Sequence, residues 1–324
     1  MRYTVENEFL RVEVDSLGAE LASVVDKASG AEMLWQGDPA VWPRRAPILF
    51  PYCGKLVNGS FTVEGKTYAG GQHGFARDLE HEFLGCDGTA LRFRLASSAE
   101  TLALFPFDFV LESTYALEGR TLRHTLAVTN PGSKELRFGI GYHPGFNLPF
   151  DAEHTTEDYE LRFDAPQTPI VQDVEAGYLT GGTHPMMENS QVIPMNDRMF
   201  DNDSICMGGL SAKTLCLVEK DTGRRITFDI EGYPYTLIWS SVGDPKLHFL
   251  CVEPWRSLQD KADASGDWAE KPCAAALAPG EKWDTTLAIT FQRAESENTK
   301  RRARCARARP FHPLNKEAFY VHCL

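Results

Sequence analysis

The chain has 324 residues, of which 43% are hydrophobic, and it carries a formal net charge of −12. This length fits one large β domain or two smaller ones, and the apolar content is enough for a substantial core. An acidic surface repels phosphate backbones and anionic lipids, so neither nucleic acid nor a membrane is an expected partner.

Short stretches of alternating apolar and polar residues follow one another along the chain, over 61–63, 67–68, 122–128, 136–142, 215–219, 226–230, 247–253 and 287–291. The turn residues Glu64-Gly65-Lys66 and Lys220-Asp221-Thr222-Gly223 each predict a hairpin. The only candidate helix lies near Ser257 to Trp268. We therefore expect an all-β fold, a large antiparallel sandwich or a barrel.

Eight cysteines occur, with no CxxC pair and no Cys/His metal spacing. Cys216 and Cys251 lie inside apolar runs, which is typical of buried free thiols in a reducing compartment. The first residues show no apolar secretion signal, and no segment has the length needed to span a bilayer. These features predict a cytoplasmic protein without a metal site.

The composition changes near the C-terminus. Residues 295–324 contain seven Lys and Arg but only three Asp and Glu, whereas the rest of the chain is acidic. We expect a domain over 1–294 followed by a basic extension over 295–324. The extension either lies outside the core or serves as an arm for an acidic partner or nucleic acid, and the acidic body favours the first interpretation.

His143 and Glu253 are the candidate catalytic residues. Each ends an alternating stretch and is followed within a residue by proline, which stops strand pairing and leaves the side chain at the sheet rim. A histidine titrates near neutral pH and suits a general acid, and a partly buried carboxylate suits a general base. A satisfied structural histidine and a solvent-facing acid are the alternatives.

Three further segments offer binding groups. The glycine-rich loop 70–74 carries His73, and Arg77 follows it, where it either binds a ligand or pairs with a neighbouring acid. Asp201 and Asp203 provide acceptors for vicinal hydroxyls, although a polar turn or a calcium loop is the alternative and the EF-hand spacing is missing. The aromatic candidates for stacking on a sugar ring are Trp239, Trp255, Phe75, Phe146 and Tyr142.

Together these segments resemble the aldose 1-epimerase (galactose mutarotase) family, and most closely its divergent bacterial branch of mutarotase-like proteins. The resemblance runs from about residue 3 to residue 292 and rests on six motifs in family order, at 49–51, 54–61, 73–77, 143–147, 200–203 and 251–255. It implies a large antiparallel β-sandwich with an open sugar-binding cleft and no cofactor.

The resemblance also implies roles for individual residues. Glu253 would take the proton from the C1 hydroxyl while His143 protonates the ring oxygen, with His73 bound near C1 and Asp203 holding ring hydroxyls. Two positions depart from the family pattern. Lys55 stands where a forked arginine is expected, and Leu237 stands where a glutamine is expected, which affects hydroxyl recognition more than the chemistry.

The sequence leaves three functions open. The first is an aldose 1-epimerase, an isomerase acting on a free hexose or related sugar as a monomer or homodimer. The second is a hexose-6-phosphate 1-epimerase, which needs several cations around the cleft, and the candidates are Arg44, Arg45, Lys55, Arg77 and Arg256. The third is a non-catalytic carbohydrate-binding protein on the same scaffold.

Overall fold

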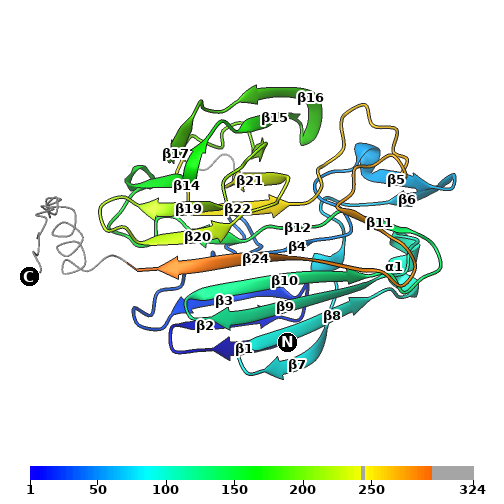
Figure 1. Ribbon diagram of the computed structural model, residues 1–324, viewed down its shortest axis with the longest axis horizontal. Coiled ribbons are helices and arrows are strands. Elements are labelled where there is room, and N and C mark those ends of the chain that lie inside the picture. The colour runs from blue at the N-terminus through cyan, green and yellow to red at the C-terminus, as the bar shows by residue number, and fades with distance from the viewer. Residues whose placement is uncertain (242–244, 294–324) are drawn as a thin grey trace, which may run out of the picture.

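The structure is a computed structural model that describes residues 1–241 and 245–293, and within them nearly all regular structure is antiparallel β (Figure 1). The nine-stranded sheet has the order β17 (Ser190–Pro194), β14 (Tyr159–Gln167), β19 (Thr214–Glu219), β20 (Arg225–Asp229), β24 (Lys282–Gln292), β10 (Thr121–Thr129), β9 (Val110–Glu118), β8 (Ala90–Ala96) and β7 (Glu82–Asp87). The eight-stranded sheet has the order β16 (Tyr178–Pro185), β15 (Ile170–Glu175), β18 (Ile205–Gly208), β21 (Tyr235–Trp239), β22 (Phe249–Trp255), β12 (Gly141–Tyr142) and β4 (Ile48–Leu49), and β13 (Gly145–Asn147) also pairs with β22.

Smaller elements complete the fold. Three further sheets are formed by β1 (Arg2–Glu6), β2 (Leu10–Asp15) and β3 (Glu20–Asp26), by β5 (Ser60–Val63) and β6 (Lys66–Ala69), and by β11 (Leu136–Phe138) and β23 (Ala275–Leu277). The helical elements are α1 (Ala99–Leu104) and the 3₁₀ turns Val57–Gly59, Ala76–Asp78 and Thr156–Asp158. No helix in the described part of the chain is long and apolar enough to cross a membrane.

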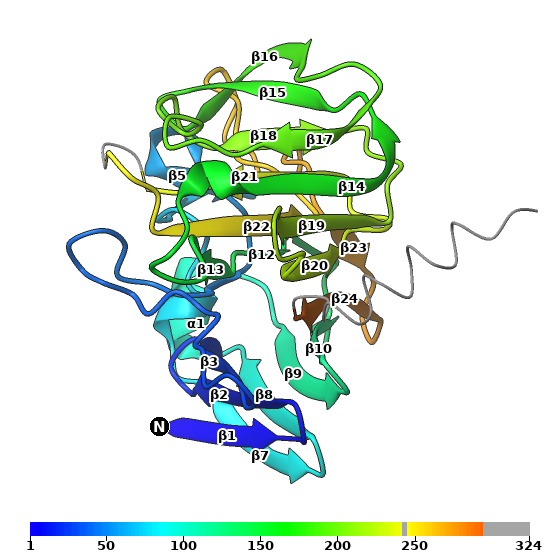
Figure 2. The ribbon, with the colours of Figure 1, turned by 90° about the vertical axis from the view of Figure 1, so that its left-hand side faces the viewer.

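The two large sheets pack face to face, as Figure 2 shows for β15, β18, β21 and β22 beside β14, β19 and β20. Phe146 on β13 brings its ring to 5.4 Å from Phe228 on β20, measured between ring centroids. The Tyr142 hydroxyl donates to the backbone carbonyl oxygens of His124 and Thr285, on β10 and β24, at 2.9 Å each. The inner faces of both sheets thus form one core, which confirms the predicted sandwich.

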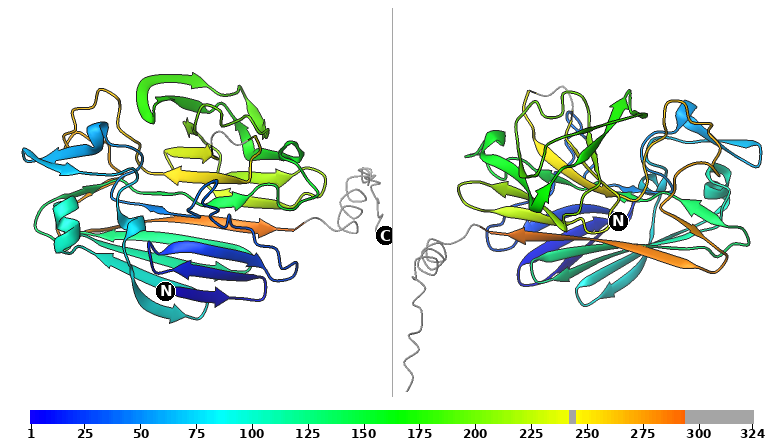
Figure 3. Two further views of the ribbon diagram at one scale, coloured as in Figure 1. Left: turned by 180° about the vertical axis from the view of Figure 1, so that it is seen from behind. Right: turned by 45° about the horizontal axis from the view of Figure 1, so that its top comes forward.

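The N-terminal sheet covers the rest of the nine-stranded sheet. The left view of Figure 3, seen from behind, shows β1–β3 in dark blue against it. Tyr3 stacks on Phe83 with ring centroids 3.8 Å apart. The Tyr115 hydroxyl donates to the carbonyl oxygen of Ala19 at 2.7 Å. The β7–β9 end therefore also has a buried face, and the eight-stranded sheet keeps its outer face free to form a site.

Asp26, at the end of β3, joins this N-terminal sheet to the nine-stranded sheet. Its buried carboxylate accepts hydrogen bonds from Arg120 at 2.8 Å and from Arg293. Burial alone would raise the pKa of Asp26, but the two arginines outweigh it and hold that pKa well below its ordinary value. The ionised carboxylate consequently stabilises the fold.

Most predicted strands are confirmed, including both hairpins (β5–β6 and β19–β20), whereas the single strand predicted over 136–142 is wrong. It is split into β11 and β12 because the chain changes sheets at Gly139. There the Ser257 Oγ lies 2.1 Å from the place where a Cβ would stand, so any larger residue would have to displace this hydroxyl. Pairing with β23 ends before this point, and pairing with β22 begins after it.

The predicted helix over 257–268 is also wrong. The backbone there bonds to distant segments: the Asp260 N–H donates to the Lys55 carbonyl at 3.0 Å, and the Ala262 N–H donates to the Leu179 carbonyl at 3.1 Å. These partners replace the bonds that a helix would make internally. The sequence reasoning missed α1, whose start is marked by a capping box between Ser98 and Thr101.

Cysteines in the described part of the chain are free thiols, and three of them, Cys53, Cys206 and Cys251, are buried. Cys216, which was predicted to be buried, is only partly so, and Cys86 is exposed. The proposed boundary at residue 294 and the basic extension over 295–324 lie outside the described residues and stay predictions.

Candidate active site

Strand register brings the two candidate catalytic residues together. Gly141 pairs with Trp255 and Gly145 pairs with Cys251, so counting two residues inward from each pair places His143 opposite Glu253. Directly opposed residues of antiparallel strands have neighbouring side chains on one face. His143 itself lies in the short gap between β12 and β13, where Pro144 has no N–H to donate to the ladder.

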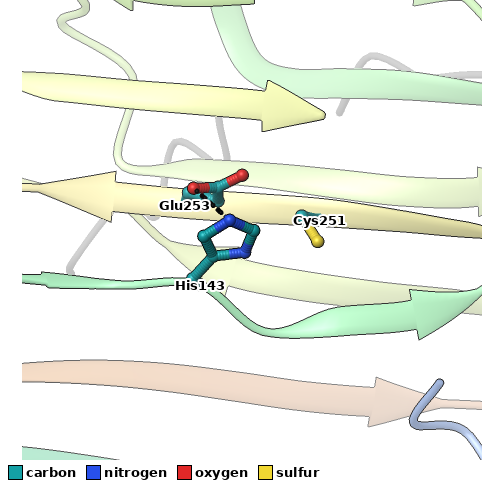
Figure 4. A group of neighbouring side chains, drawn as sticks. All are labelled: His143, Cys251 and Glu253. Carbon is teal, nitrogen blue, oxygen red and sulfur yellow. Dashed lines mark ion pairs between the residues drawn. The ribbon is translucent and has the colours of Figure 1, made fainter. Parts of the chain in front are cut away.

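The contact between the pair is direct. Nε2 of His143 lies 3.3 Å from Oε2 of Glu253 (Figure 4), and both side chains are buried, with 8% and 2% of their residues' surface exposed. A pyranose bound between the two groups would separate them by two hydrogen bonds and the intervening sugar atoms, and the observed contact is closer than that. The closer contact is compatible with the same chemistry, because the two sugar oxygens to be addressed are both bonded to C1 and are themselves neighbours.

Burial moves both protonation equilibria toward the neutral forms. It lowers the pKa of His143 well below its ordinary value, and the positive charges of Arg77 and Arg44 act in the same direction. It raises the pKa of Glu253 well above its ordinary value, an effect that the charge of Asp203 increases and the Trp255 indole opposes. Both shifts thus favour a neutral imidazole beside a protonated carboxyl group, so that the pair shares one proton.

Tryptophans enclose the histidine. Trp42 stacks on the His143 imidazole with ring centroids 5.1 Å apart, and Trp239 meets it edge-on at 5.6 Å. Gly145 permits this packing, since an added Cβ would stand 3.0 Å from the Trp42 ring. Trp42 was missed in the sequence because it lies in an irregular segment before β4 without any strand pattern.

His73 lies edge-on to His143, with ring centroids 5.5 Å apart. Its Nδ1 accepts a hydrogen bond from the Gly54 N–H at 3.0 Å, and burial lowers the pKa of His73 well below its ordinary value. The neutral ring therefore carries its proton on Nε2, as a hydrogen-bond donor. The residue has a left-handed φ of +67°, which the flanking glycine-rich loop accommodates.

These residues line a cavity of about 340 Å³ on the outer face of the eight-stranded sheet. Such a volume is at the small end of ligand sites and suits a monosaccharide. Asp203 lines the cavity, whereas Asp201 is ion-paired with Arg198 at 2.6 Å and does not line it. Of the two acids suggested by the sequence, only Asp203 is placed to meet a ligand.

Among the five candidate cations, Arg44, Lys55 and Arg77 line the cavity, and the other two do not. Lys55 donates from Nζ to the Ala176 carbonyl at 3.0 Å, and Arg77 donates from Nη2 to the Gln72 carbonyl at 2.6 Å. Arg44 forms an ion pair with Asp78 at 2.6 Å. The cations at the cavity are therefore partly occupied by the protein itself.

The remaining two cations and three of the five candidate aromatics do not line the 340 Å³ cavity. Arg256 packs over the Tyr233 ring at 4.3 Å and lines a neighbouring cavity of about 680 Å³. Trp239 and Trp255 line the 340 Å³ cavity as expected. The other three aromatics proposed for stacking are wrong for that role, because they pack in the core; they are Phe75, Phe146 and Tyr142.

Leu237 lies opposite Glu253 on β21 and also lines the cavity. It packs with Leu49, Cys53 and Leu258 in an apolar cluster beneath the site. The carboxylate of Glu253 therefore has an apolar neighbour on one side and His143 on the other. This arrangement explains the raised pKa of Glu253 and leaves no amide at this position to bind a hydroxyl.

A family model described as aldose 1-epimerase matches residues 1–290. Plasmid-encoded protein LacX of Lactococcus lactis subsp. lactis is 30% identical over 300 residues, which cover 90% of this chain and 99% of LacX. The chain belongs to the aldose 1-epimerase family.

Two solved structures are similar throughout. A galactose mutarotase related enzyme from Lactobacillus acidophilus has a TM-score of 0.86 and 29% identity, covering 91% of this chain and all of that one. A galactose mutarotase-like protein from Lactobacillus casei ATCC 334 has a TM-score of 0.82 and 30% identity, covering 90% of this chain and all of that one. Each similarity covers about nine-tenths of this chain.

Proposed function

We propose that the protein is an aldose 1-epimerase, an isomerase that interconverts the α and β anomers of a free hexose or related sugar. The observation that carries the proposal is the contact between His143 and Glu253 in a monosaccharide-sized cavity. Membership of the aldose 1-epimerase family supports it.

The reaction needs one base and one acid at adjacent oxygens. Glu253 takes the proton of the C1 hydroxyl while His143 gives a proton to the ring oxygen. The bond between C1 and the ring oxygen breaks, and an aldehyde forms at C1. Rotation about C1–C2 then presents the other face of the aldehyde, and closure returns both protons by the reverse path.

Proton accounting fits the buried pair. In the ring-opening step His143 loses a proton and Glu253 gains one, so the pair holds one proton before and after. The productive enzyme is the form with a single shared proton, whichever atom carries it in the empty site. The opposed pKa shifts of the two residues favour this form.

Other cavity residues bind and orient the sugar. His73 donates from Nε2 near C1 and the ring oxygen, and Asp203 accepts from ring hydroxyls. Asp203 has a φ of +86°, a conformation that is costly for a residue with a side chain and is often found at binding sites. Trp42 and Trp239 supply apolar surface, and they keep water away from the transferred protons.

Polarimetry tests the proposal directly. Freshly dissolved α-anomers of glucose, galactose and related sugars should reach their equilibrium rotation faster with the purified full chain than without it. Binding of a sugar without any acceleration would refute the proposal and favour the carbohydrate-binding protein.

The three buried thiols further support a cytoplasmic location.

A hexose-6-phosphate 1-epimerase is the second candidate. It is favoured by the presence of Arg44, Lys55 and Arg77 at the cavity, where a phosphate would replace their present protein partners. The same polarimetric assay with glucose 6-phosphate decides between the two. A higher kcat/KM for the phosphorylated sugar than for the free one would establish the second candidate.

A further inference from the structure

Cys251 places a third potential metal ligand, its thiol sulfur, beside the catalytic pair. It lies two residues before Glu253 on β22, so the two side chains leave the same face of the sheet. One nitrogen of His143, the Cys251 Sγ and one oxygen of Glu253 all lie within 4.8 Å of one another (Figure 4). The proposed epimerase reaction uses the first and the third of these groups and gives the thiol no role.

The spacing matches what a zinc ion requires. Zn–N and Zn–O bonds of about 2.1 Å in a tetrahedral centre separate those two atoms by about 3.4 Å. The His143 Nε2 and the Glu253 Oε2 are already 3.3 Å apart. A Zn–S bond of about 2.3 Å places sulfur about 3.6 Å from each of the other two ligand atoms. The Cys251 Sγ already lies within 4.8 Å of a His143 nitrogen and of a Glu253 oxygen.

The charges also match. A thiolate and a carboxylate together neutralise a divalent cation, which lowers the free-energy cost of burying it. Imidazole and thiolate ligands favour Zn²⁺ over Mg²⁺ or Ca²⁺. His143 and Glu253 line the cavity, so an ion has access from that side, and the fourth coordination position can hold water or a sugar oxygen. Binding must displace the thiol proton, because burial raises the pKa of Cys251 well above its ordinary value.

The only other group of potential metal ligands in the described residues is not available to bind a cation. Asp151, His154 and Glu219 also lie within 4.8 Å of one another. However, Arg224 donates hydrogen bonds to both carboxylates of that group and occupies the place of a cation. No positively charged side chain forms an ion pair with Glu253 in the described part of the chain, where its partner is His143.

We propose that His143, Cys251 and Glu253 form an inhibitory site for Zn²⁺, which occupies the atoms that transfer protons and so stops the reaction reversibly. This regulation rests on the proposed epimerase function. The cation takes Nε2 and the carboxylate oxygen out of acid–base chemistry. Removal of zinc by a chelator restores both groups.

The experiment measures binding and inhibition separately on the untagged full chain. Binding is followed with Co²⁺, whose charge-transfer absorption reports a thiolate ligand, and with equilibrium dialysis of Zn²⁺. Inhibition is followed by polarimetry over a zinc titration, then after addition of EDTA. Cys305, His312, His322 and Cys323 can bind zinc by themselves, so the difference between variants is the measure.

The variants are Cys251→Ala and Cys251→Ser, with Cys206→Ala as the matched control for loss of another buried thiol. Loss of a direct ligand should raise the inhibitory zinc concentration at least about a hundredfold in Cys251→Ala, remove one bound zinc and abolish the Co²⁺ band due to Cys251. Cys206→Ala should behave as wild type. Cys251→Ser preserves the size of the side chain and serves if the alanine variant does not fold.

Equal zinc inhibition in wild type and either folded Cys251 variant would overturn the proposal, as would equal zinc stoichiometry. If the chain proves to have no epimerase activity, the proposed function fails, while the binding measurements still decide whether the three residues hold the ion. Zinc binding that depends on Cys251 but leaves turnover unchanged would refute the inhibitory role.

Discussion

Glu253→Gln, His143→Ala and the corresponding double variant test whether the buried pair works as a unit. Each single change removes one proton-transfer group, which typically contributes about 10²- to 10⁴-fold, or about 2.7 to 5.4 kcal/mol of barrier. Asp203 is the only other carboxylate that lines the cavity in the described residues, and the ion-pair partner of His143 is Glu253. Each single variant should therefore lose most of its turnover.

The double variant gives the more informative result. If the two residues acted independently, their losses would multiply to about 10⁴- to 10⁸-fold. Because every turnover passes a proton through both members of a pair in direct contact, removing one already disables the other. The double variant should consequently be no slower than the slower single variant, within about threefold.

Polarimetry on fresh α-anomers, corrected for spontaneous mutarotation, measures all three variants. His124→Ala is the control for loss of a buried histidine, since His124 pairs with the Ser113 hydroxyl at 2.9 Å and does not line the cavity. It should lower the melting temperature without a comparable loss of kcat. Wild-type turnover in either single variant, or multiplicative losses in the double variant, would refute the shared-proton mechanism.

Three further predictions concern specificity and stability. Lys55→Arg combined with Leu237→Gln should raise kcat/KM on galactose by about tenfold or more, because each restores a hydroxyl partner; ordinary mutarotase rates in the wild type would contradict this. The pKa of Asp26 in the folded protein lies below its unfolded value of about 3.9, so the stabilisation by the ionised carboxylate is complete above that pH and is lost as the pH falls toward the folded pKa. The melting temperature of the wild type should therefore exceed that of Asp26→Asn by less at pH ~2 than at pH ~5. A difference that stays constant over this range would contradict the reasoning. Deleting 298–324 should leave both melting temperature and mutarotation nearly unchanged, since the last strand ends at Gln292, and a large loss would show that the extension packs on the body.

The strands were predictable from sequence because alternation reports directly on which face of a strand is buried. On β10, for example, Leu122, His124, Leu126 and Val128 were assigned to one face, and all four are buried. The break at Gly139 was not predictable, since the residue that crowds this glycine, Ser257, is more than a hundred positions away in the sequence. Local patterns carry no information about such a contact.

The candidate site divides in the same way. His143 and Glu253 were identifiable from residue type and strand ends, and their pairing follows from register, which only the folded sheets define. The stacking of Trp42 and the proximity of Cys251 depend on packing between segments that are irregular or uniformly apolar in sequence. Residues of that kind have no local signature that separates site from core.

The catalytic pair lies on paired strands, whereas the residues expected to bind the sugar lie in loops, and this difference separates chemistry from specificity. The acid–base pair is held by cross-strand register on a sheet whose other face is core, so its geometry is set by strand spacing. His73 and Asp203 lie outside strands with left-handed backbones, and Lys55 follows a short strand in a loop. Loops change more readily than paired strands. Substitutions at these three loop positions should therefore alter KM and the choice of sugar more than kcat, whereas changes in the β22 row that carries Glu253 should alter kcat first. A panel of sugars assayed against one conservative variant of each kind tests this division, and equal effects on kcat from both kinds would refute it.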